Sequence, residues 1–356
     1  MGFSPEIENN YLSMINQSLI LPKISITIPT YNEAENIQTC LESISIQDYP
    51  KDNIEVIVVD GGSTDKTVEI AQRFPFVTVL SNPGKDTHIG KAIGLKASKG
   101  DFWIFFDADL QANGPKWAKS MVLPLVEDTS LTASVSCYYG RPGDSCLEKY
   151  INLDPTARDT LFAWFTPSVE STIEKWKDGY AICCYTTEYL PAEGRCLFRY
   201  SLLMEMIGCE KRFRELDCLY LLTQAGHNRY AYVPNPGFYH KQIRTLAELR
   251  RKRMRNAIKN YIPGQVEGYI KYTWFDLYKP LDFLKMCALI FYAFSVIGPV
   301  LGGIWKSLKY QTHCGMVEAV YVPVAVEAYL EAFVRTKQGR LFVLRTFKGL
   351  FFRHKT

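Results

Sequence analysis

Four short apolar runs in the first third of the chain constrain its fold more than any other feature. They are rich in β-branched and aromatic side chains, as buried strands are, and they span residues 24–29, 54–60, 77–80 and 102–106. Helical apolar periods lie between the first three runs, at residues 33–46, with Asn32 as N-cap, and at residues 66–74. Strands and helices that alternate at this spacing predict an α/β fold with a parallel sheet.

Polar motifs follow three of these runs. They are PTYNE at residues 29–33, DGGSTD at 60–65 and DAD at 107–109. The carboxyl ends of parallel strands meet at one edge, so one crevice should gather all three motifs. An Asp-X-Asp sequence alone is weak evidence, because solvated loops are rich in Asp. No G-x-G-x-x-G follows the first run and no G-x-x-x-x-G-K-[ST] occurs, which argues against dinucleotide oxidoreductases and P-loop hydrolases.

The composition is that of an ordinary folded protein. Of 356 residues, 47% are apolar and 22% charged, enough for one large domain or two smaller ones. Ten cysteines show no C-x-x-C pair and no spacing typical of a zinc site, which favours free thiols in a reducing compartment. The N-terminus shows neither a secretory signal nor a myristoylation motif, so the catalytic part is expected in the cytosol.

Over about residues 22–245, the chain resembles the family 2 glycosyltransferases, which are inverting enzymes with the GT-A fold. The resemblance rests on PTYNE, DGGSTD and FFDAD, and on the stretch at residues 90–101. Downstream it continues through Phe198-Arg199, Gly208, residues 217–226 and Tyr239-His240. An ordered series of motifs is more specific than any one of them. It implies an α/β fold, with a mostly parallel twisted sheet flanked by helices.

The same resemblance implies which residues contact a nucleotide-sugar donor. They are Pro29, Tyr31, Glu33, Asp60, Gly61, Lys91, Asp107, Ala108 and Asp109. Tyr31 would stack near the base, Glu33 would accept hydrogen bonds from the ribose or base, and Asp60 would bind the base edge. The alternatives are ordinary packing for Tyr31 and a tight turn without a ligand at Gly61. Lys91 stands where many relatives have Arg, so a solvated surface lysine is its alternative.

For the chemistry, the resemblance implies a metal site and a base. Asp107, Asp109 and His240 would bind Mg²⁺ or Mn²⁺, hard cations that prefer oxygen ligands. Asp217 would be the catalytic base that deprotonates the acceptor hydroxyl, with Glu215 as a secondary candidate. A structural histidine at position 240 and a helix N-cap at Asp217 are the alternatives.

The C-terminal third has a different character. Residues 286–305 contain no charge and are long enough to cross a bilayer as a helix, whereas residues 316–334 carry Glu318, Glu327 and Glu331, which are costly at bilayer depth. We therefore expect a membrane-associated region in which the second run is a re-entrant or interfacial helix. The alternative is a buried helical pair that covers the catalytic domain.

Between the two regions, residues 244–259 hold seven cations and one acid. Three interpretations are open: anchoring on anionic membrane lipids, contact with the diphosphate by Arg250, Arg251 or Arg253, and a solvated face. Nucleic-acid binding is not expected, because no recognised module accompanies the charge.

Together these features predict four segments: an N-terminal extension (1–21), a GT-A catalytic domain (22–245), a basic amphipathic juxtamembrane segment (246–280), and an apolar helical region with a basic tail (281–356). The predicted function is inverting, metal-assisted transfer of a hexosyl-type sugar from a UDP- or GDP-sugar to a polyprenyl-linked or cell-envelope glycan acceptor. The protein would be membrane-associated, with its catalytic domain facing the cytoplasm.

Two other functions are considered. One is a catalytically weak nucleotide-sugar-binding or scaffold protein, since Leu216 and Ala92 depart from the family pattern. The other is a sugar-1-phosphate nucleotidyltransferase, which should carry a Gly-rich phosphate loop after the first strand. PTYNE is not such a loop.

Overall fold

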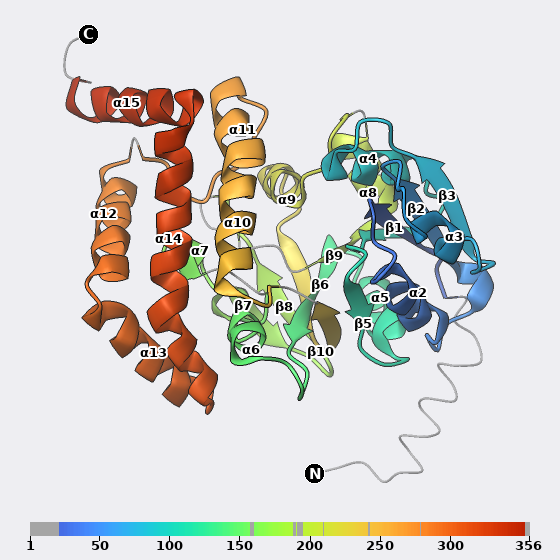
Figure 1. The fold of residues 1–356 in the computed structure, drawn as a ribbon. Coiled ribbons are helices and arrows are strands. Elements are labelled where there is room, and N and C mark those ends of the chain that lie inside the picture. Colours follow the sequence, from blue (N-terminus) through green and yellow to red (C-terminus); the bar gives the residue numbers. More distant parts are fainter. Residues whose placement is uncertain are drawn as a thin grey trace.

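The computed structural model describes residues 21–156, 160–187, 190, 195–208, 210–240, 243–277 and 279–352. The predicted N-terminal extension, apart from Leu21, lies outside these residues, as do the last residues of the basic tail, 353–356. A twisted sheet with its flanking helices occupies one side of the molecule, and the C-terminal helices lie together on the other side (Figure 1).

In the described part of the chain, ten strands form one sheet in the order β3-β2-β1-β4-β9-β6-β10-β8-β7, with β5 paired to β10. Their bounds are β1 (Ile24–Thr30), β2 (Ile54–Asp60), β3 (Val77–Ser81), β4 (Phe102–Phe105), β5 (Leu110–Ala112), β6 (Ala133–Tyr139), β7 (Ile173–Trp176), β8 (Ala181–Cys184), β9 (Cys196–Arg199) and β10 (Arg229–His240). The strands β1 to β4 are parallel, as predicted, and β6 runs parallel to β10. The remaining pairs are antiparallel, so the second half of the sheet is mixed.

Helices cover both faces of this sheet, which is why its central strands are apolar on both sides. One core cluster joins the strands to α2 (Ile37–Ser45) and α5 (Trp117–Glu127). The other joins them to α4 (Thr87–Ala97), α8 (Tyr200–Ile207) and α9 (Glu215–Gln224). Shorter helices are α3 (Thr67–Ala71), α6 (Cys146–Ile151) and α7 (Thr160–Ala163).

The predicted start of the first helix is wrong. The helix α2 begins at Ile37, and Asn32 is not its cap but adopts a left-handed φ of 55°. The Asn32 side chain instead accepts a hydrogen bond from the Thr64 amide at 2.8 Å, since an Asn tolerates this backbone conformation and can bond a neighbouring loop. Asn32 therefore ties the PTYNE loop to the DGGSTD loop.

The described part of the C-terminal region contains helices and no strand. It contains α10 (Leu246–Asn256), α11 (Ile262–Glu267), α12 (Pro280–Phe294), α13 (Ile297–Lys309), α14 (Glu318–Arg335) and α15 (Lys337–Phe352). The expectation of one helix across residues 286–305 is wrong, because α12 and α13 meet at 89° at a break around Val296, whose φ is 61°. No single described helix is both long and apolar enough to cross a membrane, but α12 and α13 meet those length and composition criteria when they are taken together.

The helix α14 packs on the basic helix α10. The Arg250 guanidinium bonds Glu327, with Nε 3.0 Å from Oε2, and also Glu331, while Arg253 donates to the Tyr321 hydroxyl at 2.8 Å. Two of the three arginines considered for diphosphate or lipid contact are therefore directed to α14. Two of the α14 acids, Glu327 and Glu331, are therefore paired with α10, whereas Glu318 pairs with Lys306 of α13.

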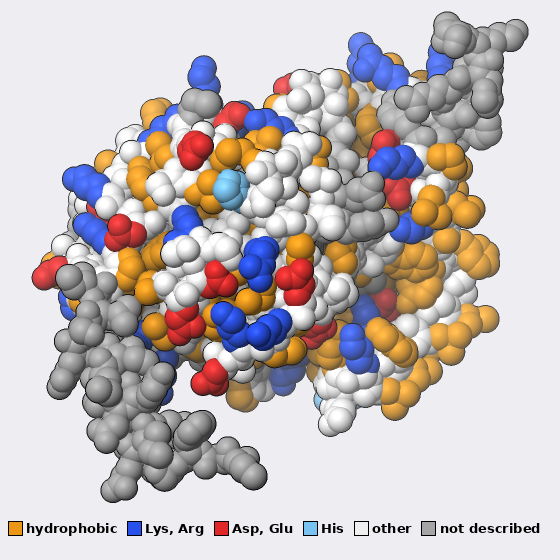
Figure 2. Space-filling model, turned by 180° about the vertical axis from the view of Figure 1, so that it is seen from behind, with side chains coloured by type: hydrophobic (Ala, Val, Ile, Leu, Met, Phe, Trp, Pro, Cys, Tyr) orange, Lys and Arg blue, Asp and Glu red, His pale blue; other side chains and the backbone are white. Residues whose placement is uncertain are grey.

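By contrast, α12 and α13 leave many large apolar side chains in solvent. We define the α12–α13 apolar surface by the exposed residues Leu281, Leu284, Phe291, Phe294, Val296, Ile297, Leu301, Ile304, Trp305 and Leu308. Apolar side chains gather over this part of the molecule in the space-filling view (Figure 2). Contiguous exposed apolar patches mark surfaces that meet a membrane or another protein.

Candidate functional site

The pairing of β5 with β10 brings Asp109 and His240 together. Leu110, the residue after Asp109, is the direct cross-strand partner of His240 at the end of β10. The His240 Nε2 atom lies 3.2 Å from the Asp109 Oδ1 atom. Ligand atoms of Asp107, Asp109 and His240 all lie within 4.8 Å of one another. The three side chains that the resemblance assigned to a metal therefore form one cluster at the carboxyl end of β4.

Asp107 makes an ion pair that the sequence did not predict. The Arg195 guanidinium bonds the Asp107 carboxylate from the residue just before β9. Burial disfavours the ionised form, but positive groups outweigh it and hold the pKa of Asp107 well below its ordinary value. In order of decreasing influence these groups are Arg195, Lys91, His240 and Lys252. No local pattern singles out Arg195, because only the pairing of β9 with β4 brings it to this edge.

Lys91 is buried rather than solvated. Its Nζ atom lies 3.5 Å from the centroid of the Phe105 ring, and the Arg195 Cζ atom lies 4.6 Å from the same centroid. The aromatic face stabilises cations that have lost part of their water. Lys91 and Arg195 thus give the DAD cluster a positive flank, and the alternative of a surface lysine is wrong.

The two acids of α9 have different surroundings. Asp217, in the first turn, accepts hydrogen bonds from the Lys271 and Tyr272 amides at 3.1 and 3.0 Å, and its other oxygen lies 3.3 Å from the Arg214 Nε atom. Burial raises the pKa of Asp217, against the lowering effects of Arg214 and the two amides. These contacts bind the carboxylate to the segment after α11.

Glu215 instead lies next to the DAD cluster. Its Oε1 atom accepts from the Cys196 amide at 2.8 Å, and its Oε2 atom lies 3.6 Å from an Arg195 guanidinium nitrogen. The same guanidinium bonds Asp107. One arginine therefore connects Glu215 to the candidate metal ligands, whereas Asp217 bonds the Lys271 and Tyr272 amides and Arg214. The role of Asp217 as a base stays a prediction.

The predicted nucleotide contacts line the ends of β1 and β2. Asp60 accepts from the Gly62 and Ser63 amides at 2.8 and 2.9 Å, so it organises the DGGSTD turn. A Cβ on Gly61 would lie 3.3 Å from the Thr30 carbonyl oxygen, so a side chain there would crowd the end of β1. Tyr31 is exposed, which leaves its ring accessible to a ligand.

Glu33 shares this crevice with the DAD cluster. Burial raises its pKa, and so do the nearby carboxylates of Asp109, Asp107 and Asp65, against a hydrogen bond from Asn36. The charge coupling indicates that Glu33 lies on the same side of the sheet as the two aspartates. Pro29 is the second-last residue of β1, and Ala108 is buried between the aspartates. Their roles in donor binding also stay predictions.

His88 joins α4 to the segment before α9. Its Nδ1 atom donates to the Phe213 carbonyl oxygen at 3.0 Å, since a carbonyl can only accept. Burial, with the positive charges of Lys91 and Arg214, lowers the pKa of His88 to about 4. The folded protein therefore holds a neutral imidazole at this position.

This histidine should make the protein less stable in mild acid. The unfolded chain binds a proton near the ordinary pKa, so stability is lost as the pH falls from about 6.5 towards 4. Between pH 7 and pH 5 the free energy of unfolding should fall by about 2 kcal/mol from this group. Urea unfolding should show a smaller pH slope in His88→Gln and an unchanged slope in His227→Gln, whose side chain is exposed. An unchanged slope in His88→Gln would contradict the assignment.

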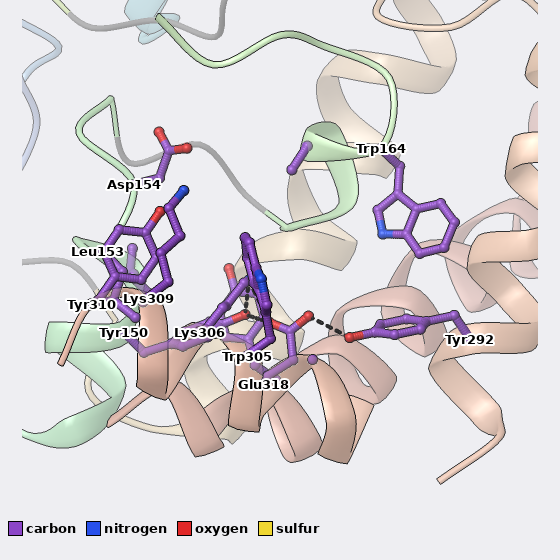
Figure 3. A pocket seen from close by; sticks show the side chains of 14 residues that line it. Tyr150, Leu153, Asp154, Trp164, Tyr292, Trp305, Lys306, Lys309, Tyr310 and Glu318 are labelled. Atoms are coloured by element: carbon purple, nitrogen blue, oxygen red, sulfur yellow. Dashed lines mark hydrogen bonds and ion pairs between the residues drawn. The ribbon is translucent and has the colours of Figure 1, made fainter. Parts of the chain in front are cut away.

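A cavity of about 390 Å³ lies between α6, α7, α13 and α14, away from the strand ends. Its floor is a buried polar network in which Glu318 Oε2 lies 2.5 Å from Lys306 Nζ and Glu318 Oε1 accepts from the Tyr292 hydroxyl at 2.9 Å. Trp164 and Tyr292 stand on one side of it and Tyr310 on the other (Figure 3). Trp305 lines the cavity and also belongs to the α12–α13 apolar surface.

The DAD cluster suits a divalent cation by its donor set. Two carboxylates and an imidazole are the oxygen and nitrogen ligands that Mg²⁺ and Mn²⁺ accept. The depressed pKa of Asp107 keeps that carboxylate ionised at neutral pH. These three side chains therefore fit a divalent cation of the kind that the resemblance implies.

Part of the chain is similar to known proteins. Residues 25–152 match the family model "Glycosyl transferase family 2". "Glycosyltransferase AglE" of Haloferax volcanii is 40% identical over 94 residues, which are 25% of this chain and 31% of that protein. A Methanococcus voltae dolichyl N-acetyl-alpha-D-glucosaminyl phosphate 3-beta-D-2,3-diacetamido-2,3-dideoxy-beta-D-glucuronosyltransferase is 40% identical over 91 residues, which are 24% of this chain and 28% of that protein. The matched segments thus span about a third of these relatives.

Among solved structures, the mannosyltransferase PcManGT of Pyrobaculum calidifontis, in complex with GDP-Man and Mn²⁺, aligns with a TM-score of 0.45 and 17% identity. The alignment covers 98% of this chain and 89% of that one. The family match includes the PTYNE, DGGSTD and DAD motifs, whose side chains the sheet gathers at one edge. Over residues 25–152, the chain is thus similar to glycosyl transferase family 2.

Proposed function

We propose that this protein is an inverting, metal-dependent glycosyltransferase that moves a sugar from a UDP- or GDP-sugar to a lipid-linked or cell-envelope glycan acceptor. The observation that carries the proposal is the convergence of Asp107, Asp109 and His240 within 4.8 Å, in a chain that matches glycosyl transferase family 2. Acidic ligands at a strand end suit a cation and the diphosphate that accompanies it.

On this proposal, Asp107, Asp109 and His240 hold the divalent cation, which when bound offsets negative charge on the leaving nucleoside diphosphate. Lys91 and Arg195 add positive charge beside Asp107, where the diphosphate would lie. Tyr31, exposed beside the DGGSTD turn, offers a face for the base. These groups act on the leaving-group side of the reaction.

When the acceptor is a hydroxyl, a base takes its proton as that oxygen attacks the anomeric carbon, whereas an ionised phosphate acceptor needs none. Asp217 was the first candidate from the sequence, but we propose Glu215 for this role. Glu215 lies 3.6 Å from the guanidinium that bonds Asp107, and its Oε1 atom is held by the Cys196 amide. A carboxylate beside the donor site suits proton transfer better than the Asp217 carboxylate, which already accepts from the Lys271 and Tyr272 amides.

Donor screening tests the function. Purified full-length protein with Mn²⁺ is incubated with a panel of UDP- and GDP-sugars, and nucleoside diphosphate release is measured with and without polyprenyl-phosphate acceptors. Release from one donor, abolished by a chelator and restored by Mn²⁺ or Mg²⁺, is the expected result. Donor binding without turnover for any donor and acceptor would instead favour the weakly active binding or scaffold protein.

We also propose that the protein is membrane-associated, with its catalytic domain facing the cytoplasm. The α12–α13 apolar surface is the support for this, because it suits insertion into the interfacial layer of a bilayer. The exposed cations Arg251 and Arg255 on α10 are available for anionic lipids. The aromatic cavity borders this surface at Trp305, so a lipid-linked acceptor could reach it from the membrane.

Binding to vesicles should depend on this surface. Replacing both Leu301 and Leu308 by Glu should weaken binding to anionic phospholipid vesicles about tenfold or more, because two apolar side chains become charged. Flotation with such vesicles measures the bound fraction. The matched control is Ile46→Glu, since Ile46 is 57% exposed but follows α2. Equal binding of all three proteins would contradict this docking surface.

A further inference from the structure

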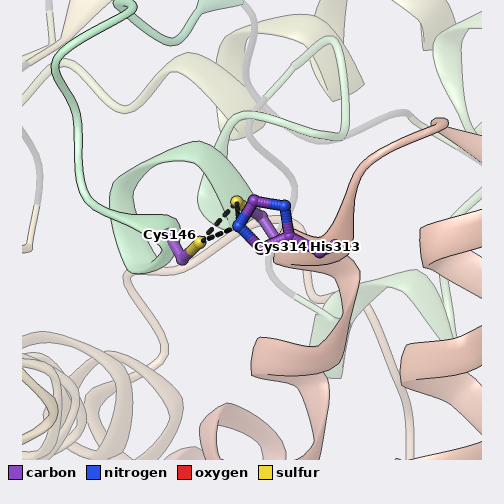
Figure 4. Close-up of side chains that lie close together, drawn as sticks. All are labelled: Cys146, His313 and Cys314. Carbon is purple, nitrogen blue, oxygen red and sulfur yellow. Dashed lines mark hydrogen bonds between the residues drawn. The ribbon is translucent and has the colours of Figure 1, made fainter.

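A second group of metal-ligating side chains lies outside the donor site. Cys146 opens α6, and His313 and Cys314 belong to the 3-10 helix η4 (His313–Val317), which connects α13 to α14. The Cys146 Sγ atom lies 3.2 Å from His313 Nε2 and 2.6 Å from Cys314 Sγ, and the two η4 ligand atoms lie 3.8 Å apart. All three side chains point to one spot between the two segments (Figure 4).

Two free thiols do not rest at this separation by themselves. A sulfur-to-sulfur distance of 2.6 Å is well inside ordinary nonbonded contact of about 3.5–4 Å. Either a covalent bond or a shared cation would relieve the contact. A disulfide would account for Cys146 and Cys314, but it would give no role to His313. That side chain is exposed, yet its ring nitrogen is directed at the sulfurs instead of facing solvent.

We propose that Cys146, His313 and Cys314 form a binding site for one soft or borderline divalent cation of the zinc class. Bond lengths of about 2.3 Å to sulfur and 2.0–2.1 Å to nitrogen, in a tetrahedron, put nitrogen and sulfur about 3.5 Å apart. The two observed distances, 3.2 and 3.8 Å, bracket this value. The sulfurs would move apart by about 1.2 Å as the cation enters and both thiols release their protons.

The exposure of the ligands leaves one coordination position open. Cys314 is buried, Cys146 is half-buried and His313 is exposed, so the cation would face solvent on the histidine side and take a water there. The site differs in chemistry from the DAD cluster, whose carboxylates prefer hard cations. It would fasten α6 of the catalytic domain to the connection between α13 and α14.

Cobalt serves as the probe, because thiolate ligands give Co²⁺ a charge-transfer absorption that oxygen ligands do not. Full-length protein is reduced with a phosphine, held in excess Mg²⁺ and titrated with Co²⁺. Zinc is then added, and the zinc bound per chain is counted by mass spectrometry of the metal. We expect the charge-transfer band to saturate at one thiolate-bound cobalt per chain. One zinc per chain should then displace this cobalt and remove the band. The Asp109→Asn variant should keep both, which separates this site from the donor site.

Variants identify the ligands. Cys146→Ser should abolish the band, and His313→Asn should lower the cobalt affinity at least about tenfold. Because His313 is exposed, its variant remains informative if a substitution at buried Cys314 prevents folding. Cys287→Ser, at an exposed cysteine outside the site, is the matched control and should change neither the band nor the cobalt affinity. The absence of the band in the reduced wild-type protein would overturn the metal site. Two thiols that become titratable only after reduction would also overturn it and would show a disulfide instead.

Discussion

Replacing Asp109 by Asn should lower kcat for sugar transfer about 1000-fold, an increase of about 4 kcal/mol in the activation barrier. The amide keeps the shape of the side chain and can still accept a hydrogen bond from His240. It nevertheless removes a full charge from the oxygen ligands that a hard divalent cation prefers. Nucleoside diphosphate release at saturating donor measures kcat. Calorimetric titration of the same sample should show Mn²⁺ binding weakened by about tenfold or more.

The control for this variant is Asp101→Asn. Asp101 precedes β4 at the opposite end from Asp109, where its Oδ2 atom accepts from the Lys23 amide at 2.8 Å. The same chemical change at that end should alter kcat by less than about threefold, because no ligand is expected there. If Asp109→Asn keeps the wild-type rate and the same Mn²⁺ dependence, the proposed cation site at the DAD cluster is excluded.

Glu215→Gln should lower kcat by about 1000-fold and leave the KM for the donor nearly unchanged. General bases contribute about 10²- to 10⁴-fold, and the base acts on the acceptor rather than on donor binding. The glutamine carbonyl can still accept from the Cys196 amide, although the ion pair with Arg195 is lost. The measurement is steady-state kinetics with the donor varied at saturating acceptor, together with calorimetry of donor binding.

Asp217→Asn is the comparison within the same helical turn. Its amide oxygen can still accept from Lys271 and Tyr272, but the ion pair with Arg214 is lost. We expect a loss of about 1–2 kcal/mol in the free energy of unfolding and a change of less than about tenfold in kcat. The reverse pattern, with a large kcat effect at Asp217 and a small one at Glu215, would make Asp217 the base.

The parallel first half of the sheet was predictable because its signal is local. Apolar runs separated by helical periods reveal β1 to β4 one at a time, and their parallel order follows from the alternation. The candidate metal ligands were found through the resemblance, since an Asp-X-Asp and a histidine far along the chain have no local link. The pairing of Leu110 with His240 supplies that link in the structure.

Features that depend on packing between distant segments were not predictable. Arg195 carries no motif, and it reaches Asp107 only because β9 pairs with β4. The break between α12 and α13 requires a left-handed φ at Val296. A β-branched residue disfavours this φ, so the residue type at this position does not predict the break. The ion pairs of Arg250 were not predicted either, because Glu327 and Glu331 lie on a helix much later in the chain.

The pairing of β5 with β10 also sets an order of events during synthesis. Asp107 and Asp109 leave the ribosome long before His240, so a nascent chain that lacks β10 carries two carboxylates without the third ligand. A cation that prefers the complete set would bind only after the sheet has closed, and would then stabilise the closed form by mass action. Metal occupancy would thus report that the sheet has closed, before any substrate arrives.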